Sequence, residues 1–132
     1  PIIKHYAKDG LTAAEKEHLV AKMTNTVVDT LKRPSEKVRV IINEYKFTNF
    51  AVNGETIKKR IEKEGAENED TNNSDVMIEA IIMEGRTPDD KESFIAHMTE
   101  TVASSGFRKS NIRMLITELK PKNFAVNGKL AK

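Results

Sequence analysis

One six-residue sequence occurs twice in this chain: Asn-Phe-Ala-Val-Asn-Gly at 49–54 and again at 123–128. The similarity extends outward from both copies, at an offset of 75 residues in the first part of each copy and 74 in the second. Open repeat arrays need about three or more units to bury a continuous core. Two copies therefore predict a duplicated domain with internal pseudo-twofold symmetry.

The differences between the copies are the first places to look for function, because both copies began from the same sequence. The first copy begins at Pro1, where the second has Val76. The second copy has Arg86, where the first has Leu11. A chain-terminal proline and an arginine present in one copy only are therefore the leading candidates for functional residues.

Length and composition narrow the class of protein. At 132 residues, each half holds about 60, which is marginal for independent folding. The halves are therefore expected to share a core or to bury their faces in an oligomer. There is no cysteine, and the three histidines have no spacing typical of a metal site, so neither a disulfide framework nor a metal centre is expected.

Charge and hydropathy exclude other classes. The net charge is +2, and the longest basic run is Lys58-Lys-Arg60, so nucleic-acid binding is not expected. No apolar run approaches the roughly 18 residues of a membrane span, and the chain opens without a basic and apolar leader. We therefore expect a soluble, cytoplasmic protein without membrane association.

Each copy has the pattern strand, helix, strand, hairpin. Apolar runs that are short and rich in β-branched residues predict strands at 1–7, 38–45, 76–83 and 112–119. Thr12 with Glu15 forms a capping box, and Pro88 stands at a first helical position, so a helix follows the first strand of each copy. The two Asn-Gly pairs, within the repeated hexapeptide, predict hairpin turns.

These elements predict an α/β fold. A strand-helix-strand unit with a helix of about 18 residues implies a right-handed crossover and a parallel strand pair. Two fused β-α-β units would then form one four-stranded mixed sheet with two helices on one face. We assign 1–61 to the first unit, 62–75 to an acidic linker and 76–132 to the second unit.

The order and spacing of the motifs, found twice, resemble the 4-oxalocrotonate tautomerase branch of the tautomerase superfamily. The matching motifs are Pro-Ile-Ile at the N-terminus, Gly-Arg-Thr before a helix, Val-Arg-Val-Ile-Ile-Asn-Glu on the second strand and Asn-Phe-x-x-x-Gly near the end of the unit. The resemblance covers essentially all of both copies outside the linker. It implies a fused, two-unit member with the tautomerase/MIF-like fold.

The resemblance also implies an assembly and a set of site residues. Short subunits of this family assemble as a trimer of dimers, which a fused chain would imitate as a homotrimer. An N-terminal proline is catalytic, two arginines bind the substrate's carboxylates and carbonyl, and a phenylalanine lines the pocket. By resemblance the catalytic residue here is Pro1, and the substrate-binding candidates are Arg39, Arg86, Arg113, Phe50 and Phe124. Leu11 and Val76 depart from the family pattern.

The chemistry of these residues is consistent with proton transfer. An α-amino group has a pKa near 7.7–8.0, and burial beside cationic arginines lowers it, so a neutral Pro1 amine can act as a general base at pH 7. An arginine fork binds a carboxylate and stabilises the negative charge of an enolate oxygen. Together these groups are suited to moving a proton between the hydroxyl and a carbon of a 2-hydroxy-dienoate, and no cofactor is expected.

We therefore expect an isomerase: a cofactor-independent tautomerase of a small dicarboxylate such as 2-hydroxymuconate, with a role in aromatic hydrocarbon catabolism. One alternative is a 3-haloacrylate hydratase or dehalogenase, although Val52 and Val126 stand where such relatives place a glutamate. Another is a non-catalytic trimeric binder of an acidic metabolite. Whether Arg39, or Arg113 of a neighbouring chain, completes the Pro1 site is open, since either arginine can instead form a structural ion pair.

Overall fold

A four-stranded mixed sheet forms the centre of the molecule. The computed structural model describes residues 1–64 and 74–131. The strands lie in the order β2-β1-β5-β6. Their bounds are β1 Ile2–Lys8, β2 Arg39–Tyr45, β5 Val76–Met83 and β6 Ile112–Leu119. The pairs β1–β2 and β5–β6 are parallel, and β1 and β5 meet antiparallel, which confirms the predicted mixed sheet.

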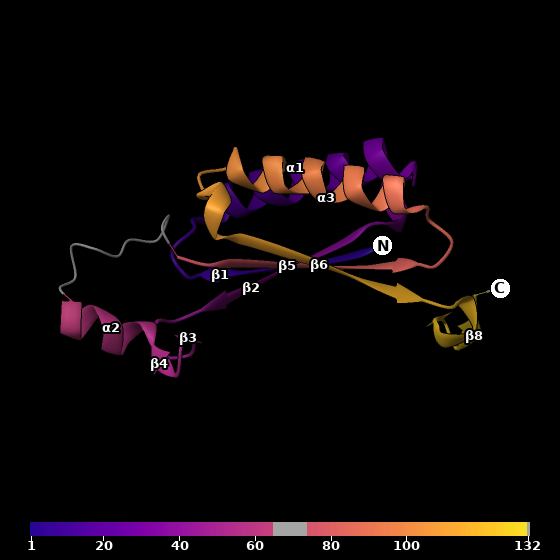
Figure 1. The fold of residues 1–132 in the computed structure, drawn as a ribbon. Helices are drawn as coiled ribbons and strands as arrows, with labels where there is room; N and C mark the ends of the chain where they lie inside the picture. Colours follow the sequence, from indigo (N-terminus) through magenta and orange to yellow (C-terminus); the bar gives the residue numbers. More distant parts are fainter. Residues whose placement is uncertain (65–73, 132) are drawn as a thin grey trace.

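The two long helices, α1 (Ala13–Leu31) and α3 (Pro88–Ala103), cover one face of the sheet side by side (Figure 1). Thr12 and Glu15 form the predicted capping box, in which the Glu15 amide donates to Thr12 Oγ1 at 3.1 Å. In α3 the amide of Asp90 donates to Thr87 Oγ1 at 3.1 Å, and Pro88 is the first helical residue. Both helix starts therefore follow from local sequence signals.

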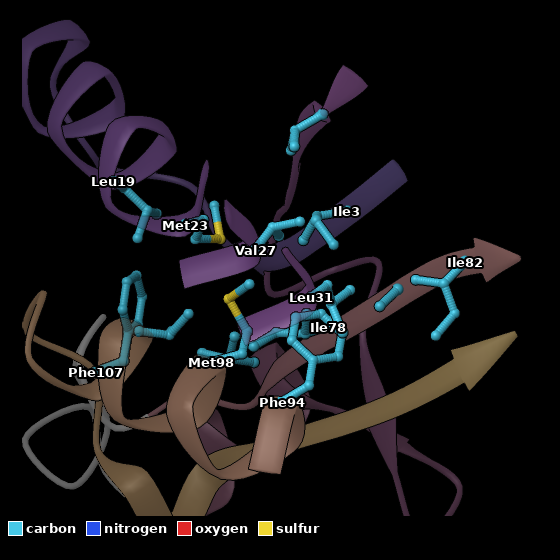
Figure 2. Close-up of a cluster of buried hydrophobic side chains, with 14 of the residues drawn as sticks. Ile3, Leu19, Met23, Val27, Leu31, Ile78, Ile82, Phe94, Met98 and Phe107 are labelled. Atoms are coloured by element: carbon cyan, nitrogen blue, oxygen red, sulfur yellow. The ribbon is translucent and has the colours of Figure 1, made fainter. Parts of the chain in front are cut away.

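A single hydrophobic core lies between the helices and the sheet, and both copies contribute to it (Figure 2). Its fully buried large side chains include Leu19, Met23, Val27, Leu31, Phe94 and Met98 from the helices and Ile3 and Ile78 from the sheet. Burying a side chain of this size stabilises a fold by about 1.5–3 kcal/mol. Because the core is shared, neither copy alone can bury it, as the length of each half predicted.

Equivalent residues of the two copies meet where the pseudo-twofold axis passes. Thr26 of α1 and Thr101 of α3, which are 75 positions apart, hydrogen-bond through their hydroxyl oxygens at 2.6 Å. On the opposite face of the sheet, the equivalent residues Lys4 and Glu79 form an ion pair, with Nζ and Oε1 3.9 Å apart. Two identical units would bring like charges together at this position, which is unfavourable. The fusion therefore permits an asymmetric pair.

Two small hairpins lie beyond opposite ends of the sheet (Figure 1). One is formed by β3 (Ala51–Val52) and β4 (Glu55–Thr56), and the other by β7 (Ala125–Val126) and β8 (Lys129–Leu130). Asn53 and Asn127 each have φ 55°, and a glycine with positive φ follows each, as the Asn-Gly signal predicted. Each copy therefore places its hairpin beyond a different end of the sheet.

The first hairpin leads into a third helix, α2 (Ile57–Glu64), which extends beyond the predicted unit boundary at residue 61. The rest of the predicted linker up to residue 73 lies outside the described residues. The described residues also include the short 3₁₀ helices η1 Ser35–Lys37, η4 Lys109–Asn111 and η5 Pro121–Asn123. In residues 1–64 and 74–131 no helix has the length and apolar character needed to cross a membrane.

The sheet face turned away from the helices carries exposed apolar side chains. Ile41 of β2 is 45% exposed and Leu115 of β6 is 46% exposed. Their sequence neighbours Val40, Ile42 and Met114 pack instead against the core, as expected for alternating sides of a strand. An apolar surface of this kind is typical of an interface between proteins.

Candidate active site

Pro1 lies at one end of the sheet, held to the neighbouring strand by its backbone. Its carbonyl accepts a hydrogen bond of 2.9 Å from the amide of Arg39, and the next residue, Ile2, is paired with Arg39 in the parallel register of β1 and β2. Pro1 is half-buried. The terminal amine therefore has a fixed position at the start of two strands and retains some access to solvent.

Arginines from three different segments surround this amine. Arg39 is the first residue of β2. Arg86 follows β5, whose last residues lie beside Pro1 because β1 and β5 are antiparallel, with Ile2 opposite Ile81. Arg33 comes from the loop between α1 and η1. The sheet topology thus brings together cationic residues that are far apart in the sequence.

The environment of Pro1 favours the neutral amine. Burial lowers the pKa of the Pro1 amine below its ordinary value of 8.0, and the positive charges of Arg33, Arg39 and Arg86 lower it further, in that order. Both causes act in the same direction, because each disfavours the ammonium form. A larger fraction of Pro1 is therefore unprotonated at neutral pH than for an ordinary terminal amine.

Within the described part of the chain, none of the three guanidinium groups is paired with a carboxylate. Nη1 of Arg39 donates to backbone carbonyls, that of Glu36 at 2.9 Å and that of Val38 at 3.5 Å. Among the described residues, neither Arg33 nor Arg86 forms an ion pair or a side-chain hydrogen bond with the protein. Positive charges that no carboxylate of the described residues neutralises, placed around the amine, can attract an anion.

The equivalent end of the second copy has a different chemistry. Val76, the counterpart of Pro1, is fully buried, and its nitrogen is part of a peptide bond. Arg113, the counterpart of Arg39, donates from Nη1 to the carboxylate of Asp75 at 3.3 Å. Tyr45 donates its hydroxyl to the backbone carbonyl of Asp75 at 2.6 Å. At this end the arginine is therefore paired with a carboxylate of the same chain.

The two candidate phenylalanines lie at opposite ends. Phe50 stacks on Tyr45 with ring centroids 4.6 Å apart, beyond the last residue of β2. At about 3.3 Å per residue, the length of β1 separates this end from Pro1 by about 20 Å. Phe124 follows β6 and η5, at the same end of the sheet as Pro1. Within one chain, Pro1, Arg39 and Arg86 are therefore together, while Arg113 and Phe50 lie at the other end.

The Pro1 site is open in the single chain. One groove among the described residues lies at the end of the sheet opposite Pro1 and is lined by residues such as Leu11, His18 and Phe107. Another is lined by Glu84 and Lys120, among others. Pro1 lines neither groove. Enclosure of the amine therefore requires a further surface, such as that of a neighbouring chain.

Sequence reasoning missed Arg33. The predicted offset changes from 75 to 74 between the helix and the second strand, so the sequence does not show whether Arg33 corresponds to Arg108 or to Phe107. The structure decides this, because Pro34 caps η1 as Arg108 caps η4. The counterpart of Arg33 is therefore Phe107, and a comparison of the two loops at this offset reveals another arginine found in one copy only.

His5 is a buried titratable group outside the site. It lies in the core with its ring 5.4 Å from that of Phe107, in an edge-to-face arrangement, and neither ring nitrogen has a hydrogen-bond partner among the residues that the structure describes. Burial lowers the pKa of His5 to about 4.

Among the described residues there is no group of three or more His, Cys, Asp or Glu side chains placed to bind a metal ion.

Comparisons with known proteins identify the family to which the chain is similar. The family model described as "Tautomerase enzyme" matches residues 1–60. "Probable tautomerase K2" of Dickeya dadantii (strain 3937) is 40% identical over 53 residues, which cover 40% of this chain and 79% of that protein. "2-hydroxymuconate tautomerase" of Pseudomonas sp. (strain CF600) is 34% identical over 59 residues, 45% of this chain and 94% of that protein.

A solved structure extends the similarity to both copies. The "F6 fused 4-OT wild type asymmetric trimer" is 25% identical with a TM-score of 0.83, and the alignment covers 99% of this chain and 96% of that one. The chain belongs to the tautomerase family of isomerases, and its two-unit architecture is that of a fused 4-oxalocrotonate tautomerase.

Proposed function

We propose that this protein is a cofactor-independent tautomerase that converts a 2-hydroxy-dienoate dicarboxylate of the 2-hydroxymuconate type to its keto form. The observation that carries the proposal is the half-buried Pro1 amine, with a lowered pKa, among three arginines that no carboxylate of the described residues neutralises. Such a site combines a neutral base with positive charge for a dianion. The name of the relative in Pseudomonas supports the same substrate class.

In the proposed reaction, Pro1 supplies both proton transfers. The amine accepts the proton of the 2-hydroxyl group, which leaves a dienolate whose negative charge the arginines stabilise. The resulting Pro1 ammonium then donates a proton to a carbon of the conjugated system, and the carbon–oxygen bond becomes a carbonyl. The amine is regenerated, and atoms and charge balance without an oxidant, metal or cofactor.

The residues have distinct proposed roles. Arg39, next to Pro1 through the register of β1 and β2, binds the carboxylate and the oxygen nearest the reacting carbon. Arg86 binds the other carboxylate. Phe124 lies at this end of the sheet, and Phe50 and Arg113 can reach a Pro1 site only from a neighbouring chain. The pocket wall is therefore proposed to depend on assembly.

We infer that the protein assembles as a homotrimer in which the open sheet faces meet. The exposed Ile41 and Leu115 and the open Pro1 site support this, and the similar solved structure of a fused 4-OT is itself described as a trimer. Light scattering should then give about three times the chain mass of 14.9 kDa. A monodisperse monomer at micromolar concentration would contradict the assembly.

The activity is tested by following ketonisation of 2-hydroxymuconate in the ultraviolet. The proposal expects kcat/KM to rise with pH as Pro1 loses its proton, with a midpoint below 8.0, because the pKa of the amine is lowered. Binding of a dicarboxylate without turnover would favour the non-catalytic binder and overturn the proposal. The dehalogenase alternative lacks support, because Val52 and Val126 are exposed and provide no carboxylate.

A further inference from the structure

Arg33 is an exposed residue of a segment at the Pro1 end of the sheet that the sequence motifs did not single out. α1 ends at Leu31, and its C-cap residue Lys32 adopts a left-handed conformation with φ 56°. The chain then reverses through Arg33 and Pro34 into η1, which leads directly to Arg39. The reversal at the helix end thus brings a third guanidinium to the end of the sheet where Pro1 lies.

The position of Arg33, just before η1 and the strand that begins at Arg39 beside Pro1, places its charge near the Pro1 amine. Arg33 lowers the pKa of the Pro1 amine more than Arg39 or Arg86 does. Within residues 1–64 and 74–131, no carboxylate neutralises it. At the other end of the sheet its counterpart Phe107 is buried against His5 and carries no charge. Arg33 is therefore a cation that accompanies only the end with a terminal amine.

We propose that Arg33 is a specificity-determining residue that binds a substrate carboxylate and makes the Pro1 site select dianions over monoanions. The inference rests on the proposed function, because it concerns the same site. Arg39 serves one carboxylate and the developing oxyanion, and Arg33 adds a second charge-assisted fork beside Arg86 for the other carboxylate. A substrate without that second carboxylate gains little from Arg33.

A structural role for Arg33 makes a different prediction. A cation after the C-terminus of a helix interacts favourably with the helix dipole. If that were its only role, Arg33→Ala would lower the melting temperature slightly and would change the kinetics of all substrates equally. The ratio between substrates therefore separates the two roles.

The experiment compares kcat/KM for 2-hydroxymuconate with kcat/KM for 2-hydroxypenta-2,4-dienoate, which lacks the second carboxylate. Arg33→Ala should lower the value for the dianion by roughly 10–10²-fold, the loss expected for a charge-assisted contact, and that for the monoanion by less than about threefold. Arg33→Lys should recover part of the difference. The matched control is Arg108→Ala, which removes an exposed arginine from the corresponding loop of the second copy and should change neither value.

A second measurement separates this inference from the proposed function. Calorimetric titration with cis,cis-muconate, a dianion that cannot tautomerise in this way, should show affinity weakened by at least about fivefold in Arg33→Ala and unchanged in Arg108→Ala. If the wild type fails to ketonise 2-hydroxymuconate but binds muconate, and Arg33→Ala weakens that binding, the proposed function falls and the role of Arg33 stands. Equal muconate affinity in Arg33→Ala and wild type, or an equal loss for both enols, overturns the role of Arg33. Absence of both turnover and muconate binding in the wild type overturns both proposals.

Discussion

The two ends of the sheet have the same backbone and opposite chemistry. At one end Ile2 pairs with Arg39, and at the other the equivalent Met77 pairs with Arg113 in the same parallel register. The first end has a terminal amine and uncompensated arginines. The second has a peptide nitrogen, and its arginine is paired with Asp75. The difference teaches that one scaffold can carry a free amine with unpaired arginines at one end and a peptide nitrogen with a paired arginine at the other.

The difference has a direct physical cause. A peptide nitrogen has no basic lone pair, so a unit joined through its first residue cannot provide a base. An arginine without a substrate there would be a partly desolvated charge without a partner, which is unfavourable. Leu11 in place of an arginine, and Asp75 opposite Arg113, each remove that cost. The two ends can therefore be tested against each other.

The largest expected effect comes from converting the Pro1 end into the chemistry of the Val76 end. Adding one residue before Pro1 makes its nitrogen an amide and should lower ketonisation of 2-hydroxymuconate by at least the 10²–10⁴-fold typical of removing a general base. The control adds the same residue after residue 132 and should retain the activity. Mass spectrometry should confirm the extended N-terminus, and full activity of that variant would exclude Pro1 as the base.

The second prediction concerns His5, whose counterpart in the second copy is Ala80. The unfolded chain binds a proton at His5 below about pH 6.5, whereas the folded chain binds it only near pH 4, so stability should fall as the pH decreases through this range. The shift corresponds to a loss on the order of 3 kcal/mol. His5→Leu should remove most of this loss, whereas the exposed His18→Ala should not, in urea denaturation at pH 7 and pH 4.5. An unchanged acid dependence in His5→Leu would show that His5 is not its source.

The third prediction concerns Arg86. Arg86→Ala should lower kcat/KM for 2-hydroxymuconate by roughly 10–10²-fold, the loss expected for a charge-assisted contact. It should also move the pH midpoint of kcat/KM upward, because removing a nearby cation raises the pKa of Pro1. Arg108→Ala at the other end should leave both quantities unchanged. A silent Arg86→Ala would separate Arg86 from the Pro1 site.

The smallest expected effect is at the other end. Leu11→Arg restores the arginine of the family pattern beside Val76, where there is no amine to use it. Turnover per folded chain should therefore stay within about twofold of the wild type. Steady-state kinetics at matched concentrations of folded protein test this, and a strong change in kcat/KM would mean that position 11 acts on a competent site.

The elements of the fold could be predicted because their signals are local. The Thr12 capping box and the Asn53-Gly54 turn each involve residues at most three positions apart, and the structure has both. A single four-stranded sheet also follows from the duplication, since each unit forms a parallel pair and the two pairs must join, whereas the structure alone shows that they join through β1 and β5. The candidate residues Pro1 and Arg86 could also be found from the duplication, because they are positions at which the two aligned copies differ.

Only the tertiary structure decided which residues surround the Pro1 amine. The antiparallel junction of β1 and β5 brings Arg86 to Pro1, and the parallel register of β1 and β2 brings Arg39 there while it leaves Arg113 at the other end. Arg33 remained unidentified because a one-residue deletion hides its counterpart until the capping positions of η1 and η4 are compared. The sequence by itself determined the repeated unit and singled out Pro1 as the candidate base, since those depend on local pattern and covalent position. The surrounding charges depend on distances through space, which are set by how the two units pack.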